Sequence, residues 1–266
     1  MHESIRRFAE DPARYVSAPL AGRILDERFV LTFGPTRHTV VTSVDVDPER
    51  LVALVEEIRD LVRPDRREVA WTIGPSCRPS DLSDRLRSLG LVAATAPFEP
   101  RTSAMALAEP PEIGSTDGVE VHVVASLADY RTSEEVMAIG SGFSDDDRAA
   151  MAATVDERYP AFLRRPEFLR YVALLDGKPV ATASACACDA GLFLGGGATL
   201  PGARGRGAYR ALVRARWDEA VRRGTPALAI HAGEMSRPIL ERLGFEPVCE
   251  LSVLHDPATV TPEPVP

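Results

Sequence analysis

The stretch from Gly191 to His231 constrains the fold of this chain more than any other. An apolar strand, Gly191–Leu200, leads through a glycine-bearing loop into an amphipathic helix, and a buried strand, Pro226–His231, follows directly. Two strands joined through a helix by such short connections form a parallel crossover unit. Three consecutive glycines, Gly195–Gly197, predict a bulge in the first strand or the close approach of a ligand. The segment therefore predicts an α/β fold with a mixed sheet.

Regular elements are predicted on both sides of this unit, from alternating apolar residues for strands and from helical spacing for helices. In the second half these patterns predict strands at Val119–Ala125, Phe168–Leu175, Val180–Ala187 and Val248–Leu254, and helices starting at Ser126 and spanning Asp145–Leu163 and Ser236–Leu243. In the first half they predict strands at Phe29–Phe33, Thr39–Val44, Glu68–Ile73 and Thr102–Leu107, and helices at Leu51–Val62 and Pro79–Leu89.

The two halves end in a similar way. Residues 81–91 (DLSDRLRSLGL) and 238–245 (PILERLGF) each form a short amphipathic helix that closes on Leu-Gly-apolar between two strands. This echo predicts two related units, residues 1–112 and 117–255, which are joined by a segment that contains prolines. The proline-rich tail, residues 256–266, is expected to be disordered.

Composition excludes several classes of protein. The net charge is −8, and RGRGAYR is the one short basic block, so nucleic acid is not expected as a partner. No apolar run reaches the ~18 residues of a membrane span, and the N-terminus lacks the apolar core of a secretion signal. The four cysteines are too scattered for a disulfide framework. A cytoplasmic protein without membrane contact is expected.

The loop between the strand and the helix, RGRGAYR at 204–210, is the segment that carries chemistry. The first amides of a helix have no internal partners, and they lie at the positive end of the helix dipole. Glycines let the backbone close around an anion, and Arg204 and Arg206 add charge that pairs with phosphate oxygens. The loop is therefore either a phosphate site or a tight turn with solvated arginines. It is neither a P-loop nor a dinucleotide fingerprint.

The order of residues favours the first reading. Arg204-Gly205-Arg206-Gly207-Ala208-Tyr209 resembles the acetyl-CoA-binding motif of the GCN5-related N-acetyltransferase (GNAT) family, Arg/Gln-x-x-Gly-x-Gly/Ala, and departs from it at Tyr209. The order of elements over roughly residues 117–255 and the ending Leu243-Gly244-Phe245 also resemble that family. The resemblance implies a GNAT-type mixed sheet in two tandem units. The N-terminal unit would be degenerate because it has no counterpart of the loop.

The resemblance also implies where acetyl-CoA binds. The strand backbone would bond to the pantetheine arm, the helix amides would take the pyrophosphate, and an amide near Ala198 or Thr199 would stabilise the oxyanion. Tyr209 would pack beside the pyrophosphate or face the core. The implied cofactor-binding residues are Gly197, Ala198, Thr199, Arg204, Gly205, Arg206, Gly207, Ala208, Tyr209 and Arg210.

The usual acid of the family, a tyrosine four residues before the closing glycine, is Leu240 here. The nearest replacements are His231, Glu234 and Ser236, which are the candidate catalytic residues. Each has a plainer alternative: a histidine at a strand end, a surface acid and a helix N-cap, respectively. A second pair, Cys186 and Cys188, would face the acceptor pocket or be buried as small apolar side chains. Because no histidines are spaced around them, we expect no metal.

The expected activity is transfer of an acetyl group from acetyl-CoA to the amine of a small molecule, by a monomer or a homodimer. The N-terminal unit would form one wall of the acceptor cleft. Two other classes stay open. One is a catalytically inactive CoA-binding or regulatory protein, and the other is a GNAT-fold enzyme that uses another acyl or aminoacyl donor.

Overall fold

The computed structural model describes residues 1–16, 22–34, 38–95 and 98–260. Its strands are β1 (Arg23–Leu25), β2 (Val30–Phe33), β3 (His38–Thr42), β4 (Glu68–Ile73), β5 (Val92–Ala93), β6 (Arg101–Leu107), β7 (Val119–Val123), β8 (Phe168–Leu175), β9 (Lys178–Cys188), β10 (Gly191–Thr199), β11 (Leu228–Ala232) and β12 (Glu246–His255). Its α-helices are α1 (Glu3–Glu10), α2 (Leu51–Val62), α3 (Leu82–Ser88), α4 (Leu127–Gly140), α5 (Asp145–Leu163), α6 (Ala208–Arg222) and α7 (Arg237–Glu241). The bounds of α2, α5, β4 and β8 are those that the sequence predicts.

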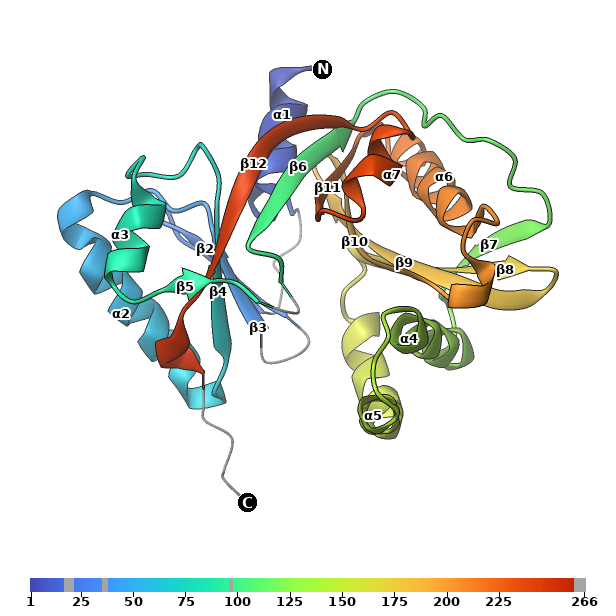
Figure 1. The fold of residues 1–266 in the computed structure, drawn as a ribbon, viewed down its shortest axis with the longest axis horizontal. Helices are drawn as coiled ribbons and strands as arrows, with labels where there is room; N and C mark the ends of the chain where they lie inside the picture. Colours follow the sequence, from blue (N-terminus) through green and yellow to red (C-terminus); the bar gives the residue numbers. More distant parts are fainter. Residues whose placement is uncertain (17–21, 35–37, 96–97, 261–266) are drawn as a thin grey trace.

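The strands of the described residues form one mixed sheet that runs through both halves of the chain (Figure 1). Along the sheet their order is β1-β2-β3-β4-β12-β6-β11-β10-β9-β8-β7, and β5 pairs with β12 beside this path. Two pairs are parallel, β3 with β4 and β10 with β11. The mixed α/β class predicted from the sequence is confirmed, and the β10-α6-β11 crossover lies where it was expected.

Helices cover both faces of the C-terminal part of the sheet. In Figure 1, α6 lies on one face of β8, β9 and β10, and the α4–α5 hairpin lies on the other. The start of α4 is fixed by a capping box, in which Ser126 accepts from the Asp129 amide and Asp129 accepts from the Ser126 amide. Small residues on the α6 face of β9, such as Ala183 and Ala185, let this helix approach closely.

Two strands cross between the halves. From the N-terminal half, β6 pairs antiparallel with β11 along its whole length, from Leu228↔Leu107 to Ala232↔Ser103. The last strand, β12, pairs with β6 through its first part and with β4 and β5 through its last part. The C-terminal half is therefore completed by β6, which comes from the N-terminal half. The N-terminal half is completed by β12, which comes from the end of the chain.

The predicted likeness of the two endings is visible in the backbone. Gly90 after α3 and Gly244 after α7 both adopt a φ of 93°, in the left-handed region that favours glycine. In each turn, the amide after the glycine donates to a carbonyl five residues back, that of Leu86 or of Leu240, at 3.1 Å. This is the same helix-ending motif at both places. The division into units at 1–112 and 117–255 stays a prediction.

The N-terminal helix α1 was not predicted. It packs on β6, β11 and β12 near the middle of the sheet, where Phe8 and Ala9 are fully buried (Figure 1). His2 caps its first turn by accepting from the Ser4 amide. Phe8 and Ala9 are its buried residues, Ile5 packs beside them in part, and most of the others are charged, so the sequence carries little of the spacing that marks a core helix.

The prediction that residues 256–266 are disordered is wrong for its first part. Asp256 is buried and accepts two hydrogen bonds from the Arg59 guanidinium, at 2.7 and 2.8 Å. A 3-10 turn follows at Pro257–Thr259, and the Thr259 hydroxyl accepts from the Val69 amide at 3.0 Å. A charged pair and a turn hold this segment on the sheet without an apolar pattern. Residues 261–266 lie outside the described part of the chain.

Candidate active site

The two parallel strands of the crossover, β10 and β11, separate soon after they pair. β10 and β11 pair only at Leu192↔Leu228 and Phe193↔Ala229. Beyond these positions β10 stays with β9 up to Thr199, whereas β11 stays with β6 up to Ala232. A wedge therefore opens between the carboxyl ends of the two strands, and among the described residues the backbone edges that face it have no strand partner there.

The predicted bulge lies in the strand that borders this wedge. The register of β10 against β9 shifts between Gly195 and Gly197, and Gly196 has a φ of 31°. A side chain at Gly196 would meet Met137 of α4 at 3.3 Å, and one at Gly197 would meet the Tyr209 ring at 3.5 Å. The contact at Gly196, together with its positive φ, favours a glycine there, whereas 3.5 Å at Gly197 is an ordinary van der Waals distance.

The loop after β10 presents free amides at the start of α6. Gly207 is the N-cap residue with a φ of 90°, and its missing Cβ would stand 3.2 Å from the Ser115 carbonyl oxygen. Among the described residues, the amides at 205 and 207–210 have no hydrogen-bond acceptor, whereas that of Arg206 lies 3.4 Å from the Ala203 carbonyl. Donors grouped at a helix start suit a phosphate group.

The three arginines of this loop differ in role. Arg204 donates to the carbonyls of Thr199 and Gly140, at 3.4 and 3.2 Å, and so ties the loop to β10 and to the end of α4. Arg210 donates to the Ser115 carbonyl at 2.8 Å. Arg206 is exposed and pairs with Asp176 at 3.4 Å. Arg206 is therefore the guanidinium that most easily exchanges its partner for a phosphate, because exposed pairs are weak.

Tyr209 faces inward, which is one of the two arrangements left open by the sequence. Its ring packs against the core between α6 and the sheet, beside Gly197, and burial raises the pKa of its hydroxyl. Tyr209, which stands where the motif has a small residue, thus fills space beneath β10 and does not cover the amides at the start of α6.

The candidate catalytic residues lie close together in the chain, but their side chains are used in different ways. His231 on β11 has Nε2 3.0 Å from the Ala9 carbonyl oxygen, and burial lowers its pKa to about 4. Glu234 is exposed, and its amide donates to Glu99 at 2.9 Å. Ser236 donates to the Gly233 carbonyl at 3.2 Å and makes no side-chain cap. Leu240, at the position of the usual acid, is fully buried.

A cavity of about 470 Å³ lies beside the wedge and is lined by both halves of the chain. His231, Phe193, Cys186 and Cys188 line it from β9, β10 and β11, and the rings of Phe193 and His231 meet edge to face at 5.1 Å. Cys186 and Cys188 line this cavity while Cys188 is buried and Cys186 half-buried, so both alternatives drawn from the sequence stay open. Sequence reasoning missed Glu99, which reaches this cavity from the first half.

The two cysteines of the cavity differ in acidity. The hydrogen bond from Cys188 lowers the pKa of Cys186, whereas the same interaction and burial raise that of Cys188. Cys77 and Cys249 have their pKa raised by burial. Among the four cysteines, Cys186 is therefore the one that we expect to react first with an alkylating agent.

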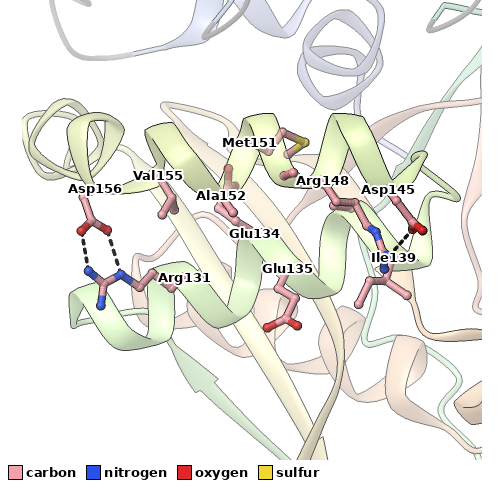
Figure 2. A pocket seen from close by; sticks show the side chains of 12 residues that line it. Arg131, Glu134, Glu135, Ile139, Asp145, Arg148, Met151, Ala152, Val155 and Asp156 are labelled. Carbon is pink, nitrogen blue, oxygen red and sulfur yellow. Dashed lines mark hydrogen bonds and ion pairs between the residues drawn. The ribbon is translucent and has the colours of Figure 1, made fainter.

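A second hollow, of about 670 Å³, runs between α4 and α5 (Figure 2). Most of its charged side chains are engaged in ion pairs: Arg131 pairs with Asp156, Arg148 pairs with Asp145, and Glu134 accepts from Arg158 and Arg170, which lie outside the lining. Figure 2 shows that the first of these pairs bridges the two helices. None of the predicted site residues lines this hollow.

In the part of the chain that is described, no three His, Cys, Asp or Glu side chains gather as metal ligands would. Over the same residues, no helix has the length and apolar character needed to cross a membrane.

Comparison with known proteins bears on this geometry. Residues 134–245, which span α4 to the turn after α7, match the model of the acetyltransferase (GNAT) family. The chain carries a GNAT-family domain. The matched range contains the bulged strand, the loop with the free amides and both strands of the wedge. Membership supports acetyl transfer from an acyl-CoA in general, and the expected resemblance is confirmed.

Solved structures show the same fold over the whole chain. A GCN5-related N-acetyltransferase from Kribbella flavida has 21% identity and a TM-score of 0.65, with 95% of each chain covered. A tandem GNAT protein from the clavulanic acid biosynthesis pathway has 15% identity and a TM-score of 0.59, covering 86% of this chain and 78% of its own. At these identities the likeness concerns the fold alone. No curated protein matches the sequence.

The residues of the GNAT domain fit the acetyl-CoA that the family uses. The cradle at Gly207 would be filled by a Cβ, and the amides around it are unpaired within the described protein. Within the described part of the chain, the β10 edge beyond Phe193 has no strand partner on the wedge side, so its backbone can hydrogen-bond to an extended arm. Nothing in the described loop blocks either contact.

Proposed function

We propose that this protein transfers an acetyl group from acetyl-CoA to the amine of a small molecule. The observation that carries the proposal is the set of unpaired amides at 205 and 207–210, directly after a strand that parts from its parallel neighbour. The amides and Arg206 would hold the pyrophosphate, and Gly197–Thr199 would bind the pantetheine arm through the backbone. Acetyl-CoA supplies the activated acyl group.

The remaining tasks fall to groups around the wedge. An amide near Ala198 or Thr199 would donate to the oxyanion, since both residues lie beyond the bulge. The acceptor amine would enter from the cavity between the halves, so that the N-terminal half forms one wall. His231 is the first group to test as base, although a histidine with a pKa of about 4 is a weak one and its Nε2 is engaged with Ala9. Glu234 and Ser236 are the further candidates.

We also propose that residues 1–112 are a degenerate GNAT-like unit. The shared turn at Gly90 and Gly244 supports this, as does the fold likeness to a tandem GNAT protein. A monomer or a homodimer in the cytoplasm is the form we expect to be active.

The binding part of the proposal is tested at Gly207. A Gly207→Val side chain would meet the Ser115 carbonyl and would be strained at a φ of 90°, so the amides would move. We expect calorimetry to show at least a tenfold loss of acetyl-CoA affinity. Gly202→Ala is the matched control, because a Cβ at that position meets nothing within 4 Å. Equal affinity in all three proteins would refute the phosphate site.

A second function, CoA binding without catalysis, is favoured by two observations. Leu240 is buried where the family acid stands, and His231 is held by α1. Release of CoA thiol across a panel of amines separates the two functions. Turnover with any amine supports the transferase, whereas tight binding without turnover supports a regulatory protein. Absence of acetyl-CoA binding would point to another acyl or aminoacyl donor.

A further inference from the structure

Among the described residues, Glu99 is the acidic side chain that lines the cavity between the two halves. Glu99 lies two residues before β6, and its carboxylate lies against the turn after β11. Its Oε2 accepts from the Glu234 amide at 2.9 Å. An added Cβ at Gly233 would stand only 1.8 Å from its Oε1. The glycine therefore makes room for the carboxylate at the end of the strand that borders the wedge.

This carboxylate keeps most of its capacity to accept hydrogen bonds. An ionised carboxyl group has about four acceptor positions, and the structure shows one hydrogen bond to it among the described residues. An ammonium has three donors and suits the remaining positions. The contacts of Glu99 are with Gly233 and Glu234, which directly follow β11, so an amine held there lies at the end of the strand that borders the wedge.

The two cationic side chains of the cavity are engaged with the protein's own acceptors. Arg165 pairs with the buried Glu167 and lies over the Phe168 ring at 5.2 Å. Arg23 donates to the carbonyls of Ala13 and Val16, at 2.6 and 3.1 Å. These two arginines therefore hold the walls of the cavity in place. Glu99 is the charged side chain of the cavity that remains to bind an incoming cation.

The rest of the cavity wall is mainly apolar. The rings of Phe98, Phe168 and Phe193 line it, together with several aliphatic side chains. The Thr102 hydroxyl also lines it and is buried without a hydrogen-bond partner. A volume of about 470 Å³ lies in the range of small-molecule sites. A polyamine or a sugar would leave most of its polar groups unpaired in such a place.

We propose that the acceptor is a primary amine on a compact aromatic or branched apolar body, and that Glu99 holds its ammonium group. This inference rests on the proposed transferase function and adds the class of acceptor. Glu99 is a binding residue from the N-terminal half, so the site is complete only when both halves are present. The apolar body would lie against Phe168 and Phe193.

Steady-state kinetics on the full chain tests the class of acceptor. With acetyl-CoA saturating, 2-phenylethylamine and 3-methylbutylamine are compared with spermidine and with the aminosugar glucosamine. We expect a kcat/KM at least tenfold higher for the two apolar amines. A preference for spermidine or glucosamine would overturn the inference and leave the transferase function intact.

Substitution of the carboxylate tests its role. Glu99→Gln keeps an oxygen for the Glu234 amide and removes the charge, so we expect at least a tenfold rise in KM for 2-phenylethylamine with unchanged acetyl-CoA affinity. Gly233→Ala displaces the same carboxylate without removing it and should act in the same direction. The control, Glu49→Gln, changes an exposed glutamate outside the cavity. An unaltered KM in both cavity variants would overturn the role of Glu99.

A readout without catalysis separates this inference from the transferase function. Cys186 lines the same cavity, so bound 2-phenylethylamine should slow its alkylation by iodoacetamide, as followed by peptide mass spectrometry. We expect at least threefold protection in the wild type and none in Glu99→Gln. Protection without acetyl-CoA turnover would refute the transferase function and support the amine site. Turnover without protection would support the transferase function and refute the amine site.

Discussion

At the scale of single residues, Arg216 is the most unusual side chain of the core. It lies on α6 with 1% of its surface exposed, donates to the carbonyls of Leu212 and Ser184, and has one terminal nitrogen without a partner. No carboxylate lies among these partners. Burial lowers its pKa, because a charge in the core is poorly solvated.

Replacing this guanidinium with an apolar side chain of similar length should stabilise the fold. For Arg216→Met we expect the free energy of unfolding to rise by about 1 kcal/mol, since removal of a poorly compensated buried charge outweighs two lost hydrogen bonds. Urea denaturation followed by circular dichroism measures this. Arg214→Met is the control, because Arg214 is exposed and, among the described residues, its ion-pair partner is Asp218. A drop of the unfolding free energy in Arg216→Met would contradict the prediction.

Single residues also show what the sequence can and cannot reveal about the site. Gly207 could be predicted, because a helix start that binds an anion needs a residue without a Cβ at a positive φ. Glu99 could not, because its partner, the Glu234 amide after β11, is 135 residues away in the chain, and only the tertiary structure brings the two together. The state of His231 was hidden for the same reason, since its partner belongs to α1.

At the scale of elements, prediction succeeded where one strong pattern covers the whole element. The strand β8 is a run of mainly apolar residues followed by an Asp-Gly turn. Helix α5 is capped by Ser144 and begins with three acidic residues that suit the helix dipole. It failed at α1, where two buried residues carry the docking. The short strands β1 and β5 were missed too, because two or three residues do not form a period.

The junction between α1 and β11 gives a prediction on pH. The pKa of His231 is lowered from 6.5 to about 4, so below pH 6.5 the unfolded chain takes up a proton that the folded protein does not. The folded state should therefore lose about 3 kcal/mol as the pH falls from 7 to 4, and this contribution is fully present above pH 6.5.

Comparison of urea unfolding at several pH values in the wild type and in His231→Gln isolates this effect, because the carboxylates contribute equally to both proteins. We expect the difference in unfolding free energy between the two proteins to shrink steadily from pH 7 to pH 4. A constant difference would show that the His231 ring titrates normally in the folded protein.

At the scale of the whole molecule, the sequence predicts two units and the structure has one continuous sheet. The turns and strand lengths of each half follow from local pattern. The crossing of β6 and β12 does not, because an edge strand pairs equally well with either neighbouring edge, and only the packed assembly decides. The pairing of β11 with β6, and not with β12, is therefore a feature that a single sequence does not specify.

The shared strands predict that both halves unfold together. Removing β12 would break its pairing with β4 in one half and with β6 beside the other, so neither half keeps a complete sheet alone. The chain has one tryptophan in each half, Trp71 on β4 and Trp217 on α6, and both are buried. Trp71→Phe and Trp217→Phe therefore leave a fluorescent reporter in one half only. In each variant, urea midpoints from fluorescence and from circular dichroism should coincide. If the midpoints separate, with the N-terminal reporter changing at a different urea concentration from the C-terminal one, the halves are independent domains and the continuous sheet does not couple them.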